Sequence, residues 1–325
     1  MQLSSVQQDL INDGMKDLTD PSAFTGVTSY GGPSYSFQGS NYGYAAGGYA
    51  PSPGAASNII DKFSFSSDGN ATDVGDLTVA RYLSSGQSSS ESGYTSGGRT
   101  PTLQNVIDKF PFATDANATD VGDLTAGKYG PTGQSSSENG YTSGGLIPAP
   151  SNVIEKFSFA TDANSADVGD LTVARGQVAG QSSSENGYTS GGLSFPGSVV
   201  HNVIDKFSFS SDANATDVGN LTVARYGCSG QSSAENGYTS GGTPPTSNVI
   251  DKFPFASDAN ASDVGDLTVG RYQLAGQSST DNGYASGGVP TYNIIDKFSF
   301  ATDANATDVG NLTVGRDYTP AGQQY

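Results

Sequence analysis

Six short stretches of the chain carry oxygen side chains at a spacing that could coordinate a calcium ion. The first has Asp68, Asn70, Thr72 and Asp76 at relative positions 1, 3, 5 and 9. Calcium takes six to eight oxygen ligands, and a short loop can supply several of them. The alternative is a turn between two strands that Asx side chains stabilise. The candidate ligands in the first three copies are Asp68, Asn70, Asp76, Asp115, Asn117, Asp123, Asp162, Asn164 and Asp170.

Few residues are suited to catalysis. Ser182, Ser183 and Glu185 have equivalents in other copies and could offer a hydroxyl and a carboxylate, but the single histidine, His201, does not recur. Nucleophilic catalysis by serine needs a base beside the hydroxyl, and no pair of carboxylates stands out for glycoside hydrolysis. The lone Cys228 excludes an intrachain disulfide and leaves little for a zinc site. We therefore predict no catalytic residues and no required cofactor.

These residues belong to a unit that occurs six times. The segment GYTSGG appears four times, and GYAAGG and GYASGG appear once each; each is followed by a D/E-K-F-x-F run and a V-G-[DN]-L-T segment. The GQSS segments start at Gly86, Gly133, Gly180, Gly230 and Gly276, which lie 47, 47, 50 and 46 residues apart. A four-stranded propeller blade has about this length. We predict an all-β fold, a six-bladed β-propeller with four antiparallel strands per blade.

Turn residues divide each unit into four strands, which in the second copy lie near 87–90, 94–96, 106–112 and 118–125. Val106, Phe110 and Phe112 alternate onto one face and Ile107 onto the other, which suits a blade packed between two neighbours. The predicted domains are an N-terminal segment (1–36), the propeller (37–316) and a C-terminal tail (317–325). The predicted blades are 38–81, 86–128, 133–175, 180–225, 230–271 and 276–316. The tail begins a seventh GQ strand, so the tail or residues near Tyr35 would close the ring.

The unit resembles the kelch-type propeller repeat, in which one strand ends in Gly-Gly and an arginine stands near the unit boundary. The corresponding residues are Gly47-Gly48, Gly97-Gly98, Gly144-Gly145, Gly191-Gly192, Gly241-Gly242 and Gly287-Gly288, with Arg81, Arg175, Arg225, Arg271 and Arg316. Lys128 replaces one arginine, and Val or Leu of DVGDL stands near the place of the kelch tryptophan.

The segment NVIDKFSFSSDANATDVGNLTVAR, together with GYTSGG, is also similar to repeats in structural proteins of marine tailed phages, cyanophages especially. This resemblance implies a non-enzymatic virion protein, such as a capsid- or tail-attached appendage or a fibre component used for host attachment.

The two faces of such a propeller should differ. The turns between the first and second strands and between the third and fourth strands lie on one face, and they are nearly uniform and acidic. The opposite face receives connections that vary between copies, such as RTPTLQ and LSFPGSVVH. Variable loops on a rigid scaffold often bind partners, although they can also reflect simple drift. The candidate partner-binding residues are Tyr82, Tyr129, Leu146, Ile147, Phe195, Tyr226, Tyr272 and Tyr292.

Net charge and the distribution of apolar residues exclude some classes of partner. A net charge of −18 would repel a phosphate backbone, so we expect no nucleic-acid binding. We also expect no signal peptide and no membrane span, since the chain has no basic start with an apolar core and no run of eighteen apolar residues. Within residues 1–36, Val6, Leu10, Ile11 and Met15 have a loose helical spacing that indicates a docking helix or a cap.

We therefore expect a structural protein of the extracellular virion that contacts other virion proteins through residues 1–36. A host-surface glycan or protein is the further expected partner. A lectin-like, glycan-binding propeller is the first alternative, and a hydrolase is the second.

Overall fold

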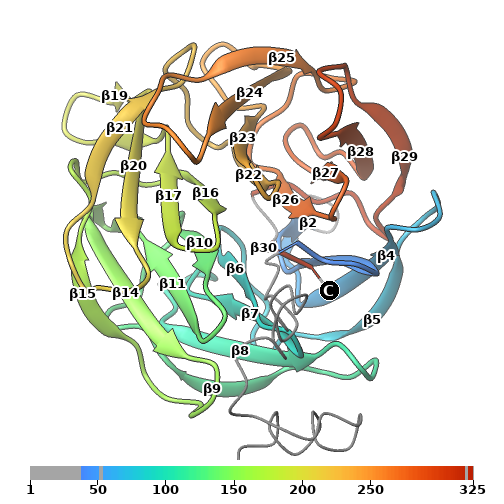
Figure 1. Ribbon diagram of the computed structural model, residues 1–325. Coiled ribbons are helices and arrows are strands. Elements are labelled where there is room, and N and C mark those ends of the chain that lie inside the picture. Colours follow the sequence, from blue (N-terminus) through green and yellow to red (C-terminus); the bar gives the residue numbers. More distant parts are fainter. Residues whose placement is uncertain (1–37, 51–53, 319–320, 325) are drawn as a thin grey trace, which may run out of the picture. The chain divides into compact units, whose positions relative to one another are not determined.

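The described residues form a ring of six β-sheets around a central axis (Figure 1). The structure is a computed structural model that describes residues 38–50, 54–318 and 321–324. Each sheet has four antiparallel strands, and the inner strands of neighbouring sheets contact one another around the whole ring. The prediction of an all-β, six-bladed propeller is confirmed.

We name the strands of each blade inner, second, third and outer, in order from the axis. The inner strands are β6 (Ser85–Ser88), β10 (Thr132–Ser135), β16 (Ala179–Ser182), β22 (Ser229–Ser232), β26 (Ala275–Ser278) and β30 (Ala321–Gln324). The second strands are β1 (Tyr42–Ala46), β7 (Ser92–Ser96), β11 (Asn139–Ser143), β17 (Asn186–Ser190), β23 (Asn236–Ser240) and β27 (Asn282–Ser286). The third strands are β4 (Ile59–Ser64), β8 (Val106–Pro111), β14 (Val153–Ser158), β20 (Val203–Ser208), β24 (Val249–Pro254) and β28 (Ile294–Ser299).

The outer strands are β5 (Thr72–Asp76), β9 (Thr119–Asp123), β15 (Ala166–Asp170), β21 (Thr216–Asn220), β25 (Ser262–Asp266) and β29 (Thr307–Asn311). Blade 1 consists of β30, β1, β4 and β5, and blades 2 to 6 follow in chain order. Three short hairpins lie in connections from the second to the third strand: β2 (Tyr49–Ala50) with β3 (Ala55–Ala56), β12 (Leu146–Ile147) with β13 (Ala149–Pro150), and β18 (Leu193–Ser194) with β19 (Val199–Val200).

The C-terminal tail closes the ring. Strand β30 pairs with β1, with Gly43 opposite Gln324 and Ala46 opposite Ala321. Blade 1 therefore joins residues 42–76 to residues 321–324 instead of using one continuous segment. Residues near the start of the described chain do not supply this strand, because Gln38 Nε2 donates to the Ser232 carbonyl (3.2 Å) of blade 5 and Gly39 N donates to the Ser278 carbonyl (2.8 Å) of blade 6.

Aromatic side chains form the hydrophobic core between blades. The Tyr94 ring of blade 2 stacks on Phe159 of blade 3, with ring centroids 4.8 Å apart, and contacts Phe157 at 5.5 Å. The same tyrosine-on-two-phenylalanines arrangement recurs at all six interfaces. Ile107 packs with Tyr94 toward blade 3, whereas Phe110 packs toward blade 1, as the alternation predicted.

Glycine in the inner strands sets how closely the blades meet. A Cβ atom on Gly133 would lie 2.0 Å from the Gly86 carbonyl oxygen of the preceding blade, and the equivalent glycines make the same approach around the ring. A side chain here would push two inner strands apart. The repeated GQSS segment therefore encodes contact between blades as well as strand structure.

Burial of the interface tyrosines gives a prediction about pH. Burial raises the pKa of Tyr141, Tyr188, Tyr238 and Tyr284 to about 12. The unfolded chain loses these protons near pH 10, so their stabilising contribution is complete below about pH 10 and is lost as the pH rises toward about 12. We expect the free energy of unfolding, measured in urea, to fall over this range. In Tyr141→Phe the fall should be smaller, and an unchanged slope would contradict the assignment.

Candidate functional site

The propeller has two faces of different character, which we name by their turns. The uniform face carries the turns from inner to second strand and from third to outer strand, and the variable face carries the remaining connections. Both ends of the described chain lie at the uniform face: Gln38 and Gly39 contact the last residues of β22 and β26, and Gln324 ends β30. The connections that differ most between units lie on the opposite side.

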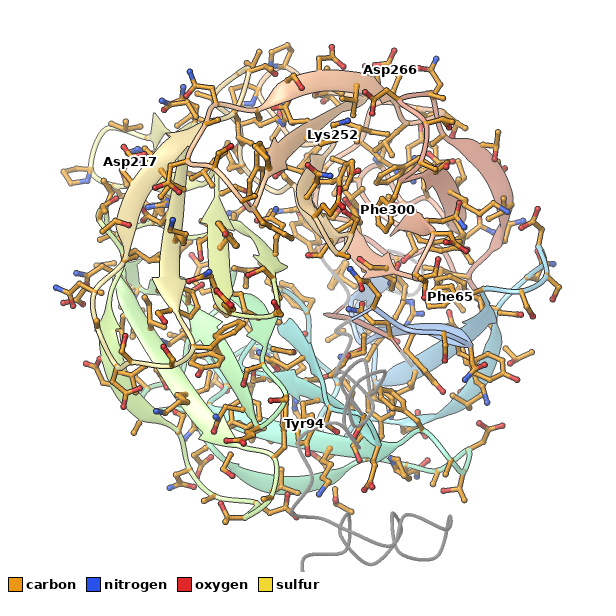
Figure 2. The ribbon with its side chains drawn as sticks, viewed as in Figure 1. Phe65, Tyr94, Asp217, Lys252, Asp266 and Phe300 are labelled. Carbon is orange, nitrogen blue, oxygen red and sulfur yellow. The ribbon has the colours of Figure 1, made fainter. Side chains whose placement is uncertain are left out.

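The D-x-N residues of the uniform face contact the neighbouring blade. Asp115 accepts a hydrogen bond from Lys62 Nζ of the preceding blade at 2.8 Å, and Asn117 Oδ1 accepts one from the Asp76 backbone N–H at 3.1 Å. Every interface repeats both contacts, and Figure 2 labels one of the lysines, Lys252. The six lysine–aspartate pairs are Lys62–Asp115, Lys109–Asp162, Lys156–Asp212, Lys206–Asp258, Lys252–Asp303 and Lys297–Asp68.

The geometry of these loops bears on the calcium hypothesis. Within residues 38–50, 54–318 and 321–324, no three His, Cys, Asp or Glu side chains are grouped so that they could hold a metal ion. Asp68 binds Lys297 Nζ and Asn70 binds the Asn311 backbone, so the oxygens nearest in sequence point to different protein partners. Calcium at the loops stays a prediction of the sequence alone, and so does the Asx-stabilised turn, because the contacts of Asp68 and Asn70 cross to the neighbouring blade.

Metal removal tests this point. If the loops bind calcium, a free calcium concentration well above the dissociation constant would raise the melting temperature by several degrees. We expect less than about 1 °C of difference between samples with calcium and samples with EDTA, measured by differential scanning calorimetry. A shift of several degrees that the Asp115→Asn variant removes would establish the loop as a calcium site.

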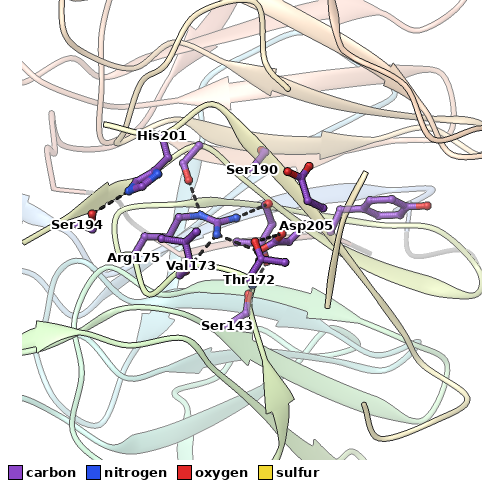
Figure 3. A network of polar contacts seen from close by, with 12 residues as sticks. Ser143, Thr172, Val173, Arg175, Ser190, Ser194, His201 and Asp205 are labelled. Atoms are coloured by element: carbon purple, nitrogen blue, oxygen red, sulfur yellow. Dashed lines mark hydrogen bonds and ion pairs between the residues drawn. The ribbon is translucent and has the colours of Figure 1, made fainter. Parts of the chain in front are cut away.

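A second set of ion pairs is fully buried between blades. The Arg175 guanidinium, which follows the outer strand of blade 3, lies 2.9 Å from the Asp205 carboxylate on the third strand of blade 4 (Figure 3). Asp205 also accepts hydrogen bonds from the backbone and hydroxyl of Thr172, and Arg175 donates to the carbonyls of Gly191 and Thr189. The other pairs are Arg81–Asp108, Lys128–Glu155, Arg225–Asp251, Arg271–Asp296 and Arg316–Asp61.

One of these pairs departs from the rest in three residues at once. Lys128 is the only lysine at this position, Glu155 is the only glutamate, and Ser165 stands where the other five units have alanine. Glu155 accepts from Lys128 Nζ, from the Thr125 backbone at 2.8 Å and from Ser165 Oγ at 2.5 Å. Burial would raise the pKa of Glu155, but the Lys128 charge and these hydrogen bonds lower it below its usual value. The side chain of Glu155 is one methylene longer than that of an aspartate. Its carboxylate thus reaches the lysine that replaces the arginine of the other units.

The inner strands form a hydrogen-bonded collar around the axis. The Gln87 side-chain amide donates to the Tyr141 carbonyl of the next blade at 3.0 Å, and the glutamines at the equivalent position do the same in every blade. Backbone N–H groups at the strand ends donate to the side chains of Ser135, Ser182, Ser232, Ser278, Gln324 and Ser88 in turn, which closes a circle. The collar surrounds a small, polar cavity of about 90 Å³.

The single cysteine, unlike the single histidine, lies among inner-strand serines that line the central cavity. His201 Nε2 lies 2.8 Å from Ser194 Oγ on the variable face, and burial, followed by the charge of Arg175, lowers the pKa of His201. Cys228 is buried beside the axis, and burial raises the pKa of its thiol to about 11. Ser183 caps its own turn by accepting from the Asn186 backbone. These contacts account for each group as part of the fold.

The predicted partner-binding residues lie on the variable face with different exposure. Tyr82, Tyr129, Tyr226 and Tyr272 are half-buried, and each forms a β-bridge with the residue that follows the double glycine of its blade. Phe195 is 45% exposed between β18 and β19, and Ile147 and Tyr292 are half-buried. Leu146 is only 1% exposed, so its side chain is part of the packing under this face.

An aromatic cluster on this face includes residues beyond the predicted partner-binding set. The rings of Tyr49, Tyr82 and Tyr318 lie within 5.4 to 5.8 Å of one another. The Arg99 guanidinium lies over the rings of Tyr129 (5.2 Å) and Tyr82 (5.9 Å). A signal did exist: Arg99 is the only charged residue, and Tyr49 the only aromatic one, at the position after the double glycine. We call Tyr49, Tyr82, Arg99, Tyr129 and Tyr318 the tyrosine–arginine cluster.

The predicted docking residues Val6, Leu10, Ile11 and Met15 lie outside the described residues. The part of the chain that the structure describes contains no helix of the length and apolar character needed to cross a membrane.

Fold and face geometry define the class: a six-bladed β-propeller with a uniform face and a variable face. No protein-family model matches the chain, and a search of curated proteins finds no match.

Proposed function

We propose that the chain is a non-enzymatic structural protein of a tailed-phage particle that presents the variable face of its propeller to other surfaces. The observation that carries the proposal is the separation of the two faces. The described chain begins at Gln38 and ends at Gln324 on the uniform face, while the connections that differ between units lie on the other. An attachment through residues 1–36 would join the propeller at its uniform face and leave the variable loops free for contact.

The rigidity of the ring supports the same role. Each interface combines a buried ion pair, an exposed lysine–aspartate pair and a tyrosine stacked on two phenylalanines, and the tail closes the circle. Such a scaffold holds its loops in fixed positions, which lowers the entropic cost of binding through them.

The kelch-like character of the repeat belongs to this proposal. Each second strand ends in a double glycine whose residues have positive φ, such as Gly97 (65°) and Gly98 (101°). The boundary arginine is buried and ion-paired in five of the six units. Both features support a kelch-type unit in which the outer-strand Val and the following Leu take the place of the tryptophan.

Two measurements on purified particles test the role. Mass spectrometry should detect this protein in many copies per particle, and particles without it would overturn the proposal. An epitope tag inserted after Gly197 in the variable loop of blade 4 should be accessible to antibody on intact particles. The matched control places the tag after Ser211, in the uniform-face turn of the same blade, where we expect weaker labelling.

A further inference from the structure

Almost every positive charge of the propeller is used between blades. Lysine and arginine side chains form twelve ion pairs, six exposed and six buried. Among the residues that the structure describes, Arg99 is the single lysine or arginine without an ion pair. A cation left unpaired in a chain of net charge −18 is available for an anionic group of a ligand.

The backbone of Arg99 is held by hydrogen bonds, but one donor of its side chain has no hydrogen-bond partner. Its backbone exchanges two hydrogen bonds with Tyr82, at 2.8 and 3.0 Å, which fixes the residue at the rim of the variable face. The guanidinium lies over two tyrosine rings, yet its Nε atom is buried and has no hydrogen-bond partner in the described chain. A buried donor without a partner is destabilising, and the same is seen at the Nε atoms of Arg81, Arg225, Arg271 and Arg316, so the missing ion pair is what distinguishes Arg99.

The surroundings of Arg99 are aromatic. Tyr318 is 38% exposed, and its carbonyl accepts a hydrogen bond from the Leu83 backbone at 2.7 Å, which holds Tyr318 beside Tyr82. Next to it, Asp317 bridges to Tyr49 and has a buried Oδ1 atom with no hydrogen-bond partner in the described residues. The cluster therefore combines tyrosine rings with a guanidinium that has no ion pair, and the Asp317 carboxylate lies beside it.

This combination matches the chemistry of an acidic sugar. A pyranose ring has a face of C–H groups that packs on an aromatic ring, and its hydroxyl groups both donate and accept hydrogen bonds. A carboxylate on the sugar would give Arg99 a planar partner for its guanidinium. The net negative charge of the protein is screened beyond about 8 Å at physiological salt, so the nearby charges of Arg99 and Asp317 decide whether the anion binds.

We propose that the tyrosine–arginine cluster is a binding site for a saccharide that carries a carboxylate group. The site adds a ligand class to the proposed function. It rests on that function, because the proposed function makes the variable face the one that contacts other surfaces.

Titration calorimetry of the full chain tests the site with a matched pair of ligands. The probe is an oligogalacturonide, and its control is the same oligosaccharide with its carboxyl groups methyl-esterified, which removes the charge and keeps the rings. We expect the acid to bind at least tenfold more tightly than the ester. Equal affinity for the two forms, or no binding of either, would overturn the proposal, and binding of a polyglutamate peptide in place of the sugar would assign the cluster to a protein partner.

Variants locate the binding on the cluster. Arg99→Leu introduces the residue that blades 3 and 4 carry at this position, as Leu146 and Leu193, so it should fold normally and bind the acid at least tenfold more weakly. Tyr82→Ala should also weaken binding. Its control is Tyr226→Ala, which changes the equivalent tyrosine of blade 5, where Thr243 stands in place of Arg99. An equal loss from Tyr226→Ala would remove the cluster from the explanation.

The outcomes separate the two proposals. A protein that is present in particles but binds no oligogalacturonide keeps the structural role and loses the saccharide site. A protein that binds the acid through Arg99 but is absent from particles keeps the site and loses the particle role.

Discussion

A chain that ends at residue 320 should lose its cooperative folding, because the deletion removes the inner strand of blade 1. Strand β30 pairs with β1 along its length, and Gln323 donates to the Tyr94 carbonyl of blade 2 at 2.8 Å. Without it, β1 becomes an open edge, and the collar of inner strands is broken on both sides. We expect a loss of more than about 5 kcal/mol in the free energy of unfolding, which is the whole stability of many domains.

Urea unfolding followed by tyrosine fluorescence measures this loss, and size-exclusion chromatography reports association through the exposed edge. The matched control ends at residue 324, which keeps all of β30 and should unfold like the full chain. If the chain that ends at residue 320 unfolds at the same urea concentration as the control, ring closure by the tail does not stabilise the fold.

Replacing Arg175 with methionine should cost about 3–5 kcal/mol, because it leaves the buried Asp205 carboxylate without its cation. Both side chains are 0% exposed, so water cannot replace the lost partner. The double variant Arg175→Met with Asp205→Leu removes both charges and should recover much of the loss, since a buried pair often contributes little beyond what apolar side chains would.

The control for this prediction is Lys206→Met, which breaks the exposed pair with Asp258 at 2.5 Å. Exposed pairs contribute at most about 1 kcal/mol, so the urea midpoint should move little. Similar losses from Arg175→Met and Lys206→Met would mean that burial does not set the strength of these interblade pairs.

The repeat made the fold predictable from the sequence. The period matched the length of a four-stranded blade, and the six copies predicted six blades. Alternation in NVIDKFPF placed Ile107 and Phe110 on opposite faces of blade 2, where they contact different neighbours. The closing strand could not be chosen, because the GQ of the tail and the segment near Tyr35 were both available and the choice depends on pairing across nearly the whole chain. Gly43 and Gln324 meet only because five other blades hold them in place.

The candidate site was less predictable, because its contacts cross between units. The acidic loops suggested calcium when each was considered alone. Their partners are lysines 51 to 56 residues away for most pairs and 229 residues away for Lys297 and Asp68. The tyrosine–arginine cluster similarly joins Tyr49 and Tyr318, which lie 269 residues apart in a loop and in the tail segment.

The triplet of Lys128, Glu155 and Ser165 has a consequence for how such a gene can change. Nearly identical units invite recombination that deletes or duplicates one of them. Five interfaces use the same arginine and aspartate, so units exchanged among them would still match. Loss of the second unit would instead set Arg81 against the longer Glu155 in a site built for lysine. These three residues therefore tie the third unit to the second and restrict the order in which the blades can be assembled.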